Sequence, residues 1–198
     1  MTGRFIALEG GEGSGKSTQA KLLAADLGAM ATFEPGDTAL GGAIRRLLLD
    51  PATSALEDRA EALLMAADRA QHVAEVIRPA LESGRHFVCD RYLASSIAYQ
   101  GYGRGLDPGR VAALSEWATA GLVPDLTVLL DVPEEVAESR LTSTRDRFED
   151  AGHEFHRRVL AGYRALAADP NWVVIDGTRS VDEVAVAVRA AVRDRLAL

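Results

Sequence analysis

The sequence of 198 residues contains very little cysteine, and its apolar residues form no long uninterrupted run. Cys89 is the only cysteine, which excludes an internal disulfide bond and a cysteine-rich metal site. It follows Phe87 and Val88, so we expect a buried core thiol rather than a nucleophile. No apolar stretch approaches the ~20 residues of a membrane-spanning helix, and the first residues lack an export signal. We therefore expect a cytoplasmic protein without a membrane partner.

Positive charge is also scarce, above all as lysine. The formal net charge is −7, with 22 lysine and arginine residues against 29 acidic residues, which argues against a nucleic-acid partner. Clustered arginines could still hold a small anion, so a mononucleotide suits this composition better than a polymer. The hydrophobic content of 47% over this length predicts one domain spanning residues 1–198, with a full core.

Residues 10–17, GGEGSGKS, match the phosphate-binding pattern GxxxxGK[ST]. The motif follows an apolar run at 5–9 and precedes a helical pattern at 18–27, which is the strand–loop–helix context that the pattern requires. Its glycines let consecutive N–H groups face an anion, and the helix adds its positive dipole end. The strictness of the pattern disfavours the alternative, a glycine-rich turn that binds nothing. We predict that a nucleoside triphosphate is bound by Gly10, Gly11, Glu12, Gly13, Ser14, Gly15, Lys16, Ser17 and Thr18.

Lys16 is one of only two lysines, with Lys21, in a chain that otherwise uses arginine. A compact ammonium fits between phosphate oxygens where a planar guanidinium would not. We expect Lys16 to reach the β- and γ-phosphates and the Ser17 hydroxyl to occupy one position on Mg²⁺.

Short apolar runs alternate with long helical patterns along the chain. This alternation predicts repeated βαβ units, and therefore a three-layer α/β fold whose parallel sheet carries helices on both faces. We expect about five strands, at 5–9, 30–33, 86–90, 126–131 and 172–176. Because ligands bind at the carboxyl ends of such strands, we expect the site beside the acids there: Glu9, Glu34, Asp90, Asp131 and Asp176.

Helix ends are predicted by capping residues and by proline. Asp107 and Pro108 read as an N-cap and first helical residue, and residues 180–183 form a capping box before the last helix. A helical pattern at 56–78 precedes Pro79, which permits a bend or a break.

Residues 142–152 are polar and charged and lie between two helical patterns. Their charge alone favours a solvated connection. The alternative is a short mobile lid over the site.

The residues outside the phosphate loop distinguish between classes of nucleotide-binding protein. The chain has no Asn-Lys-x-Asp stretch for guanine selection and no strand ending in adjacent acids, which disfavours GTPases and motor ATPases. The third strand is instead followed by an acid and a cation side by side, Asp90 and Arg91.

From about residue 5 to residue 176 the chain resembles bacterial thymidylate kinases, which are P-loop nucleoside monophosphate kinases. The resemblance is specific because the order and spacing of several short blocks match together. These blocks are 9–18, 34–36, 44–49, 67–72, 90–101, 124–127 and 146–149. It implies transfer of the γ-phosphate of ATP to dTMP, giving ADP and dTDP, with Mg²⁺ as cofactor. It also implies a homodimer.

The resemblance assigns roles at the acceptor phosphate. Arg91 and Arg45 would hold it, and Asp90 would orient Arg91 or a water bound to Mg²⁺. The alternative for Arg91 is a structural ion pair with Asp90, which is disfavoured because adjacent side chains on an extended segment point apart.

The nucleoside side is assigned in the same way. Arg69 would bind the thymine base, unless it is an ordinary exposed helix charge. Tyr99 is either a core residue or a contact of the sugar, and Glu12 would bind the deoxyribose 3′-hydroxyl. The remaining residues that the resemblance places at the acceptor are Glu34, Pro35, Met65, Ser96 and Gln100.

The family differs in the position of its catalytic arginine. Members with arginine after the acid of the phosphate loop need none in the lid, and the others use lid arginines. Because Gly13 follows Glu12 here, the resemblance implies a lid cation, either Arg145 or Arg147. We expect Arg145 and Arg147 to be exposed. Lys16 and Arg91 are the other two residues of the predicted catalytic set.

Three positions depart from the bacterial pattern. Phe33 replaces an arginine, Asp37 a glycine, and Met65 a phenylalanine that would lie against thymine. Methionine can still lie flat on a base, whereas an acid at Asp37 would repel the acceptor phosphate unless it is turned away. The alternatives to a thymidylate kinase are another nucleoside monophosphate kinase and a non-catalytic nucleotide-binding regulator.

Overall fold

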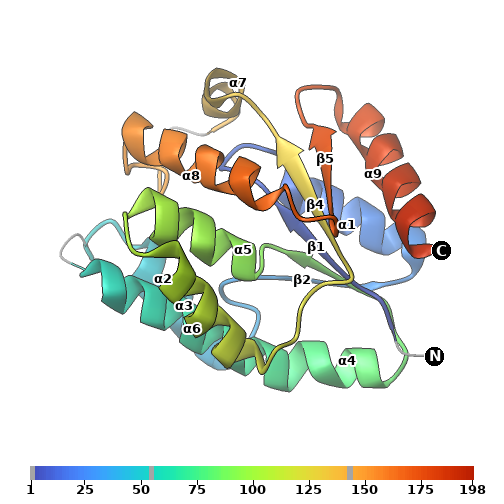
Figure 1. The fold of residues 1–198 in the computed structure, drawn as a ribbon, viewed down its shortest axis with the longest axis horizontal. Helices are drawn as coiled ribbons and strands as arrows, with labels where there is room; N and C mark the ends of the chain where they lie inside the picture. Colours follow the sequence, from blue (N-terminus) through green and yellow to red (C-terminus); the bar gives the residue numbers. More distant parts are fainter. Residues whose placement is uncertain (1–2, 54–55, 142–144) are drawn as a thin grey trace.

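The computed structural model describes residues 3–53, 56–141 and 145–198. In this part of the chain, parallel strands form one five-stranded sheet in the order β2-β3-β1-β4-β5 (Figure 1). The strands are β1 Phe5–Glu9, β2 Met30–Phe33, β3 Phe87–Asp90, β4 Leu126–Asp131 and β5 Trp172–Asp176. The predicted strands are confirmed, except that β3 begins one residue later than expected.

Helices cover both faces of the sheet, as the sequence predicts (Figure 1). The helices are α1 Lys16–Leu27, α2 Ala39–Leu49, α3 Asp58–His72, α4 Arg78–Glu82, α5 Leu93–Ser96, α6 Pro108–Thr119, α7 Glu134–Ser139, α8 His153–Leu166 and α9 Val181–Leu196. Two segments, η1 Val73–Ile77 and η2 Ile97–Gly103, are π-helical.

The strand β1 shows how the layers are built. Its side chains alternate, so Ile6 and Leu8 pack with α1 and α9, whereas Phe5 and Ala7 pack toward η1 and α4. All five residues of β1 are buried because both faces are covered. The end of β1 therefore leads into the phosphate loop from the centre of the sheet, with β3 on one side and β4 on the other.

The predicted helix ends are confirmed by the capping contacts. Asp107 accepts a hydrogen bond from the N–H of Arg110 at 2.9 Å, with Pro108 as the first residue of α6. Ser180 and Glu183 form the reciprocal capping box of α9. Among the described residues, no helix combines the length and apolarity that crossing a membrane requires.

Pro79 does not end the helical stretch, which continues to Glu82 as α4. The segment just before α4 is the π-helical η1, where the N–H of Arg78 donates to the carbonyl of Val73, one residue further back than in an α-helix. A π-helical turn accommodates a residue that would otherwise strain the helix. The second π-helical segment, η2, contains Tyr99 and Gln100, which line the site.

Candidate active site

The phosphate loop joins β1 to α1 and leaves the start of α1 open. Gly13 and Gly15 have φ of 69° and 88°, and Gly15 is the N-cap of α1 without a side-chain cap. The first N–H groups of α1 therefore face an anion site without competition from a capping side chain. An arginine in place of Gly13 would be strained here, because its Cβ atom would lie 2.4 Å from the carbonyl oxygen of Ala137 unless the backbone moved.

Lys16 is the buried cation of this loop, with 6% of its surface exposed. Its Nζ donates to the carbonyl of Gly11 at 3.0 Å and lies 3.9 Å from Glu12. Burial, reinforced by the positive charge of Arg91, lowers the pKa of Lys16. The ammonium is thus held by its own loop, within a cleft whose cavity volume is about 470 Å³.

Ser17 and Asp90 meet across the cleft, where α1 begins and β3 ends. The Ser17 hydroxyl donates to Asp90 Oδ2, while Asp90 Oδ1 is buried without a partner among the described residues. A hydroxyl beside a carboxylate oxygen that lacks a partner suits a hard cation such as Mg²⁺, which prefers oxygen ligands. These two residues therefore fit the metal that the sequence implies.

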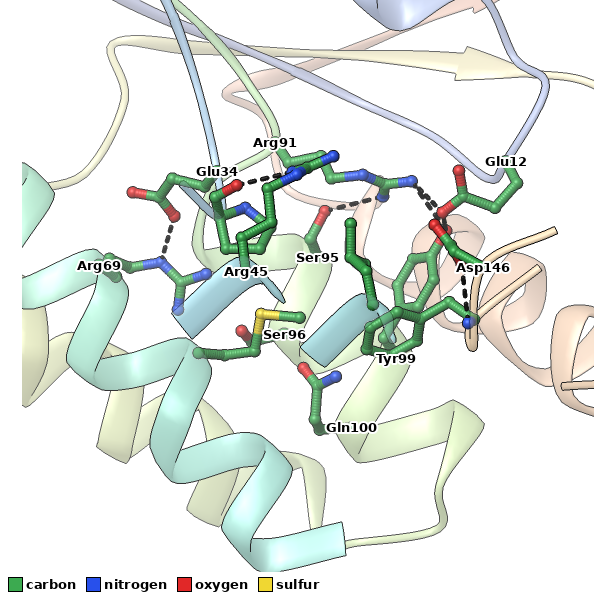
Figure 2. Close-up of a pocket in the computed structure, with 14 residues that line it drawn as sticks. Glu12, Glu34, Arg45, Arg69, Arg91, Ser95, Ser96, Tyr99, Gln100 and Asp146 are labelled. Carbon is green, nitrogen blue, oxygen red and sulfur yellow. Dashed lines mark hydrogen bonds and ion pairs between the residues drawn. The ribbon is translucent and has the colours of Figure 1, made fainter. Parts of the chain in front are cut away.

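Arg91 is the central cation of the site and has a strained backbone, with φ of 70°. Its guanidinium donates to Glu12 Oε1 at 2.5 Å, the Tyr99 hydroxyl at 3.0 Å and the Gly10 carbonyl at 3.2 Å. The structural ion pair with Asp90, considered as an alternative, is not the one that forms, because Arg91 turns toward the phosphate loop. Figure 2 shows Arg91 pointing toward Glu12.

Glu12 is held as a carboxylate in spite of its position in the phosphate loop. Burial alone would raise its pKa, but the charges of Arg91 and Lys16 together with the Tyr99 hydroxyl at 2.8 Å lower the pKa of Glu12 to about 2. Glu12 thus accepts hydrogen bonds at any ordinary pH, which is the property needed to bind a hydroxyl group.

Glu9 supports Arg91 from behind, which the sequence did not predict. It is fully buried and accepts hydrogen bonds from the N–H of Tyr92 at 2.9 Å, the hydroxyl of Ser95 at 2.6 Å and that of Tyr163 at 3.1 Å. Both of these hydroxyls lie 3.2 Å from Arg91. No sequence signal could identify Tyr163, because it occupies an ordinary apolar position of α8.

A pocket beside the phosphate loop brings together every residue that the resemblance placed at the acceptor (Figure 2). Those residues are Glu12, Glu34, Pro35, Arg45, Met65, Arg69, Arg91, Ser96, Tyr99 and Gln100. The sequence did not predict four further lining residues, Leu49, Ser95, Asp146 and Phe148. Ser96 Oγ and Gln100 Oε1 are buried without a hydrogen-bond partner among the described residues, so both are available to a ligand.

Arg69 is buried on α3, with 2% exposed, so it is not an ordinary exposed helix charge. Its Nε donates to Glu34 at 2.8 Å, and its other nitrogens donate to the Ser115 hydroxyl and the Tyr92 carbonyl at 3.3 and 3.2 Å. These contacts fix the guanidinium at the wall of the pocket.

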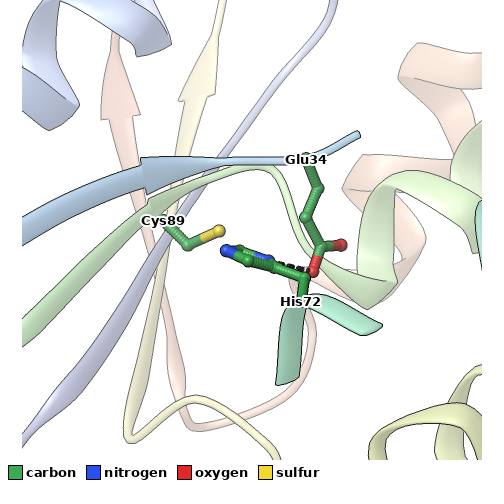
Figure 3. A group of neighbouring side chains, drawn as sticks. All are labelled: Glu34, His72 and Cys89. Carbon is green, nitrogen blue, oxygen red and sulfur yellow. Dashed lines mark hydrogen bonds and ion pairs between the residues drawn. The ribbon is translucent and has the colours of Figure 1, made fainter. Parts of the chain in front are cut away.

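Glu34, His72 and Cys89 form a buried group behind this wall, with their ligand atoms within 4.8 Å of one another (Figure 3). The ring nitrogens of His72 lie 2.8 Å from Glu34 and 2.7 Å from Thr32, and the Cys89 thiol donates to a backbone carbonyl at 2.9 Å. Burial raises the pKa of this thiol. Arg69 already neutralises the charge of Glu34. We therefore interpret these three residues as a hydrogen-bonded support of the pocket and not as a metal site. The expectation of a buried core thiol is confirmed.

Among the described residues, Asp37 does not line the acceptor pocket, but it lines the cleft beside the phosphate loop together with Arg45 and Arg91. Its carboxylate accepts a hydrogen bond from Thr32. Arg45 donates to the carbonyl of Pro35 at 2.6 Å and lies 5.5 Å from the centre of the Phe33 ring. Phe33 therefore supports Arg45 by a cation–π contact.

The two lid arginines are held differently, and within the described ranges neither forms a hydrogen bond or an ion pair with the phosphate loop. Arg145 pairs with Glu138 at the surface and is 37% exposed. Arg147, only 12% exposed, donates to Glu61 at 2.6 Å and to the Leu48 carbonyl at 2.8 Å, so the expectation of two exposed arginines is wrong for Arg147. The first residues of the predicted lid, 142–144, lie outside the described residues.

A further cavity, of about 320 Å³, is lined by Ser14 and Gly15 of the phosphate loop and by Thr18 of α1. Two arginines that the sequence did not single out, Arg140 and Arg179, also line it. Arg140 donates to the carbonyl of Gly177 at 3.0 Å, which fixes it against the loop after β5.

The fold and the site together define a class of enzyme. A phosphate loop lies at the end of the central strand, and a guanidinium connects it to a second pocket lined by arginines. Two anionic substrates would meet at that guanidinium, which is the arrangement of a P-loop kinase acting on a small acceptor.

The particular family follows from comparison with known proteins. The family model for thymidylate kinase matches residues 8–188. A thymidylate kinase of Leifsonia xyli subsp. xyli is 52% identical over 203 residues, covering 98% of this chain and 96% of the relative. That of Cutibacterium acnes is 48% identical over 199 residues, covering 97% of each chain. The chain belongs to the thymidylate kinase family.

Proposed function

We propose that this protein transfers the γ-phosphate of ATP to dTMP, giving ADP and dTDP. The observation that best supports this activity is the position of Arg91, which bonds both the phosphate loop and the wall of the acceptor pocket. Two polyanions must approach each other in such a reaction, and a shared cation offsets their repulsion as charge spreads over the transferring oxygens.

The donor triphosphate would occupy the loop and the start of α1, with the rest of ATP directed toward the cavity beside Arg140 and Arg179. Lys16 would exchange its bond to the Gly11 carbonyl for the β- and γ-phosphates. Ser17 and Asp90 would hold Mg²⁺, which when bound neutralises phosphate charge. The catalytic work assigned to the chain itself is the orientation of the phosphoryl group by Lys16 and Arg91.

The acceptor pocket matches the chemistry of thymidine monophosphate. Arg45 and Arg91 are placed to hold its phosphate, and Glu12, a carboxylate with a pKa of about 2, is placed to accept from a sugar hydroxyl. Gln100 Oε1 has no partner within the described part of the chain and can accept from the ring N–H of thymine, while Arg69 can donate to a base carbonyl. Met65 supplies an apolar surface for the ring.

Arg145 is the lid cation that we propose for the transition state. Its partner Glu138 is as exposed as Arg145 itself, so the pair can exchange at little cost for contact with phosphate. Arg147 is engaged by a buried carboxylate and is the residue that anchors this segment.

An assay of ADP release tests the proposal. Purified protein is given ATP and Mg²⁺ with dTMP, dUMP, dCMP, AMP or GMP in turn. We expect dTMP to have the highest kcat/KM and dCMP a value lower by about 10²-fold or more, because the ring nitrogen of cytosine cannot donate to Gln100. A preference for AMP or GMP would indicate a different nucleoside monophosphate kinase. No ADP release with any acceptor would instead favour a regulatory protein.

A homodimer and a cytoplasmic location complete the proposal. The helices α2, α3 and α6 are neighbours (Figure 1). They expose large apolar side chains, with Leu47 53%, Leu63 58% and Trp117 81% exposed. An exposed apolar group of this kind is typical of an interface between copies of a chain. The location follows from the substrates, which are intracellular nucleotides.

A further inference from the structure

Glu61 is a fully buried carboxylate of α3 that does not itself line the acceptor pocket or the cavities beside the phosphate loop. It collects hydrogen bonds from three different parts of the chain. Gln100 Nε2 donates to it at 2.8 Å, Arg104 at 3.1 Å and Arg147 at 2.6 Å. One acid thus joins η2, the residue after η2 and the lid segment.

The contact with Gln100 fixes which end of its side-chain amide faces the pocket. A carboxylate paired with two guanidinium groups can only accept hydrogen bonds, so the NH₂ end of the amide must turn toward Glu61. The carbonyl end, Oε1, is left buried and without a partner among the described residues. Since Gln100 lines the pocket beside Ser96 and Tyr99, the pocket presents an acceptor at this position (Figure 2).

The contact with Arg147 fixes the wall of the same pocket. The N–H of Arg147 donates to the Leu49 carbonyl at 3.1 Å, and its guanidinium lies 4.6 Å from the centre of the Phe148 ring. Phe148, Leu49 and Asp146 all line the pocket. Holding Arg147 therefore holds the aromatic ring that closes the pocket on this side.

We propose that Glu61 is a positioning residue that determines base specificity, by orienting the Gln100 amide as a hydrogen-bond acceptor and holding Phe148 against the pocket. The inference rests on the proposed function. A base whose ring nitrogen carries hydrogen, as in thymine, meets a complementary acceptor. Cytosine presents an acceptor at that nitrogen, so it meets a second acceptor and is rejected.

The test is the ratio of kcat/KM for dTMP to that for dCMP, measured in Glu61→Gln. A glutamine at this position can also accept from or donate to Gln100, so the Gln100 amide is free to turn over. When the amide turns, thymine loses a hydrogen bond to Gln100 and cytosine gains one. We therefore expect the ratio to fall by at least about tenfold. The ratio does not depend on the fraction of protein that is folded, so a loss of stability alone leaves it unchanged.

Asp58→Asn is the matched control. Asp58 lies one turn from Glu61 on α3, is 46% exposed, and reaches Arg104 at 3.8 Å. This variant removes the same charge from the same helix, and we expect its ratio to stay within about twofold of the wild type. If Glu61→Gln does not fold, Glu61→Asp replaces it, because it keeps the charge but withdraws the carboxylate from Gln100.

A second measurement is independent of activity. Amide hydrogen exchange in residues 145–151 should become faster in Glu61→Gln than in Asp58→Asn without any nucleotide. An unchanged substrate ratio in the folded Glu61 variant overturns the inference, whatever the exchange shows. If the wild type itself does not phosphorylate dTMP, the proposed function fails instead, so the two failures can be distinguished.

Discussion

At the scale of single residues, two buried acids, Glu34 and Glu61, and the partly buried Glu12 organise the arginines of this site. Glu12 holds Arg91 at 2.5 Å, Glu34 holds Arg69 at 2.8 Å, and Glu61 holds Arg147 at 2.6 Å. Each pair fixes a guanidinium in one orientation before substrate arrives, so less conformational entropy is lost on binding. Lys16 differs, because its partner is a backbone carbonyl that phosphate can replace.

Replacing Lys16 with methionine tests the role of this charge. Methionine retains the apolar stem but removes the ammonium, so we expect kcat to fall by about 10²-fold or more while the melting temperature stays nearly unchanged. Steady-state kinetics and a thermal unfolding curve measure both. An unchanged kcat with a normal melting curve removes Lys16 from the mechanism.

Asp68 provides a prediction about pH. Burial and the nearby charge of Glu34 raise the pKa of Asp68 to about 6, against an ordinary value of 3.8. The folded protein therefore binds this proton more tightly than the unfolded chain, and the associated stability is lost as the pH rises through about 6. Asparagine keeps the acceptor for the N–H of Gly36 and removes the charge.

Asp68→Asn should accordingly raise the melting temperature more at pH 8 than at pH 5. We expect the gain at pH 8 to exceed the gain at pH 5 by at least about 2 °C, as measured by calorimetry. Equal gains at the two pH values would show that Asp68 has an ordinary pKa in the folded protein.

At the scale of elements, the site depends on segments that are not regular α-helix or strand. The phosphate loop leaves the start of α1 uncapped, and η2 places Tyr99 and Gln100 at the pocket. In the segment after residue 144, Arg147 faces the interior and Arg145 the surface. The two lid arginines therefore have separable roles.

Single alanine variants distinguish these roles. We expect Arg145→Ala to lower kcat by about 10²- to 10³-fold with little change in stability, since an exposed ion pair contributes at most about 1 kcal/mol. Arg147→Ala should instead lower the stability by about 3 kcal/mol and raise KM for dTMP, because it breaks a buried pair. Kinetics and urea unfolding of both variants measure this, and the reverse assignment would make Arg147 the catalytic cation.

At the scale of the whole molecule, the acceptor pocket and the cavity beside Arg140 and Arg179 are lined by different residues of the phosphate loop, and the exposed apolar side chains Leu47, Leu63 and Trp117 line neither of them. The site of chemistry and the surface proposed for dimerisation are thus formed by different residues. That residues 1–198 form one domain stays a prediction, which a single cooperative unfolding transition would support.

Trp117→Glu tests the dimer. A charge buried in an apolar interface is costly. We therefore expect the wild type to sediment as a dimer and the dissociation constant of the Trp117→Glu dimer to be at least about tenfold higher. Val186→Glu is the control, because Val186 is 58% exposed on a different helix, α9. The proposed interface is contradicted if the wild type is a monomer, or if Trp117→Glu leaves the dissociation constant of the dimer unchanged.

The sequence by itself determined the strands, the starts of α6 and α9, and the phosphate loop. Each of these rests on local information, because periodicity, capping and a glycine-rich turn are encoded in neighbouring residues. The residues around the acceptor pocket were predicted from the resemblance to a family and not from such local patterns. Asp107 and Ser180 cap their helices as predicted, since a cap needs only the next few N–H groups.

Only the tertiary structure decided which charge pairs with which. Asp90 is the acid next to Arg91 in the sequence, yet Arg91 pairs with Glu12, which is 79 residues away. Arg147 likewise pairs with Glu61, which is 86 residues away. Every arginine offers the same five donors, so its partner depends on which segments the packed layers bring within about 3 Å of it. That distance is fixed by the packing of the whole core, and no short stretch of sequence contains it.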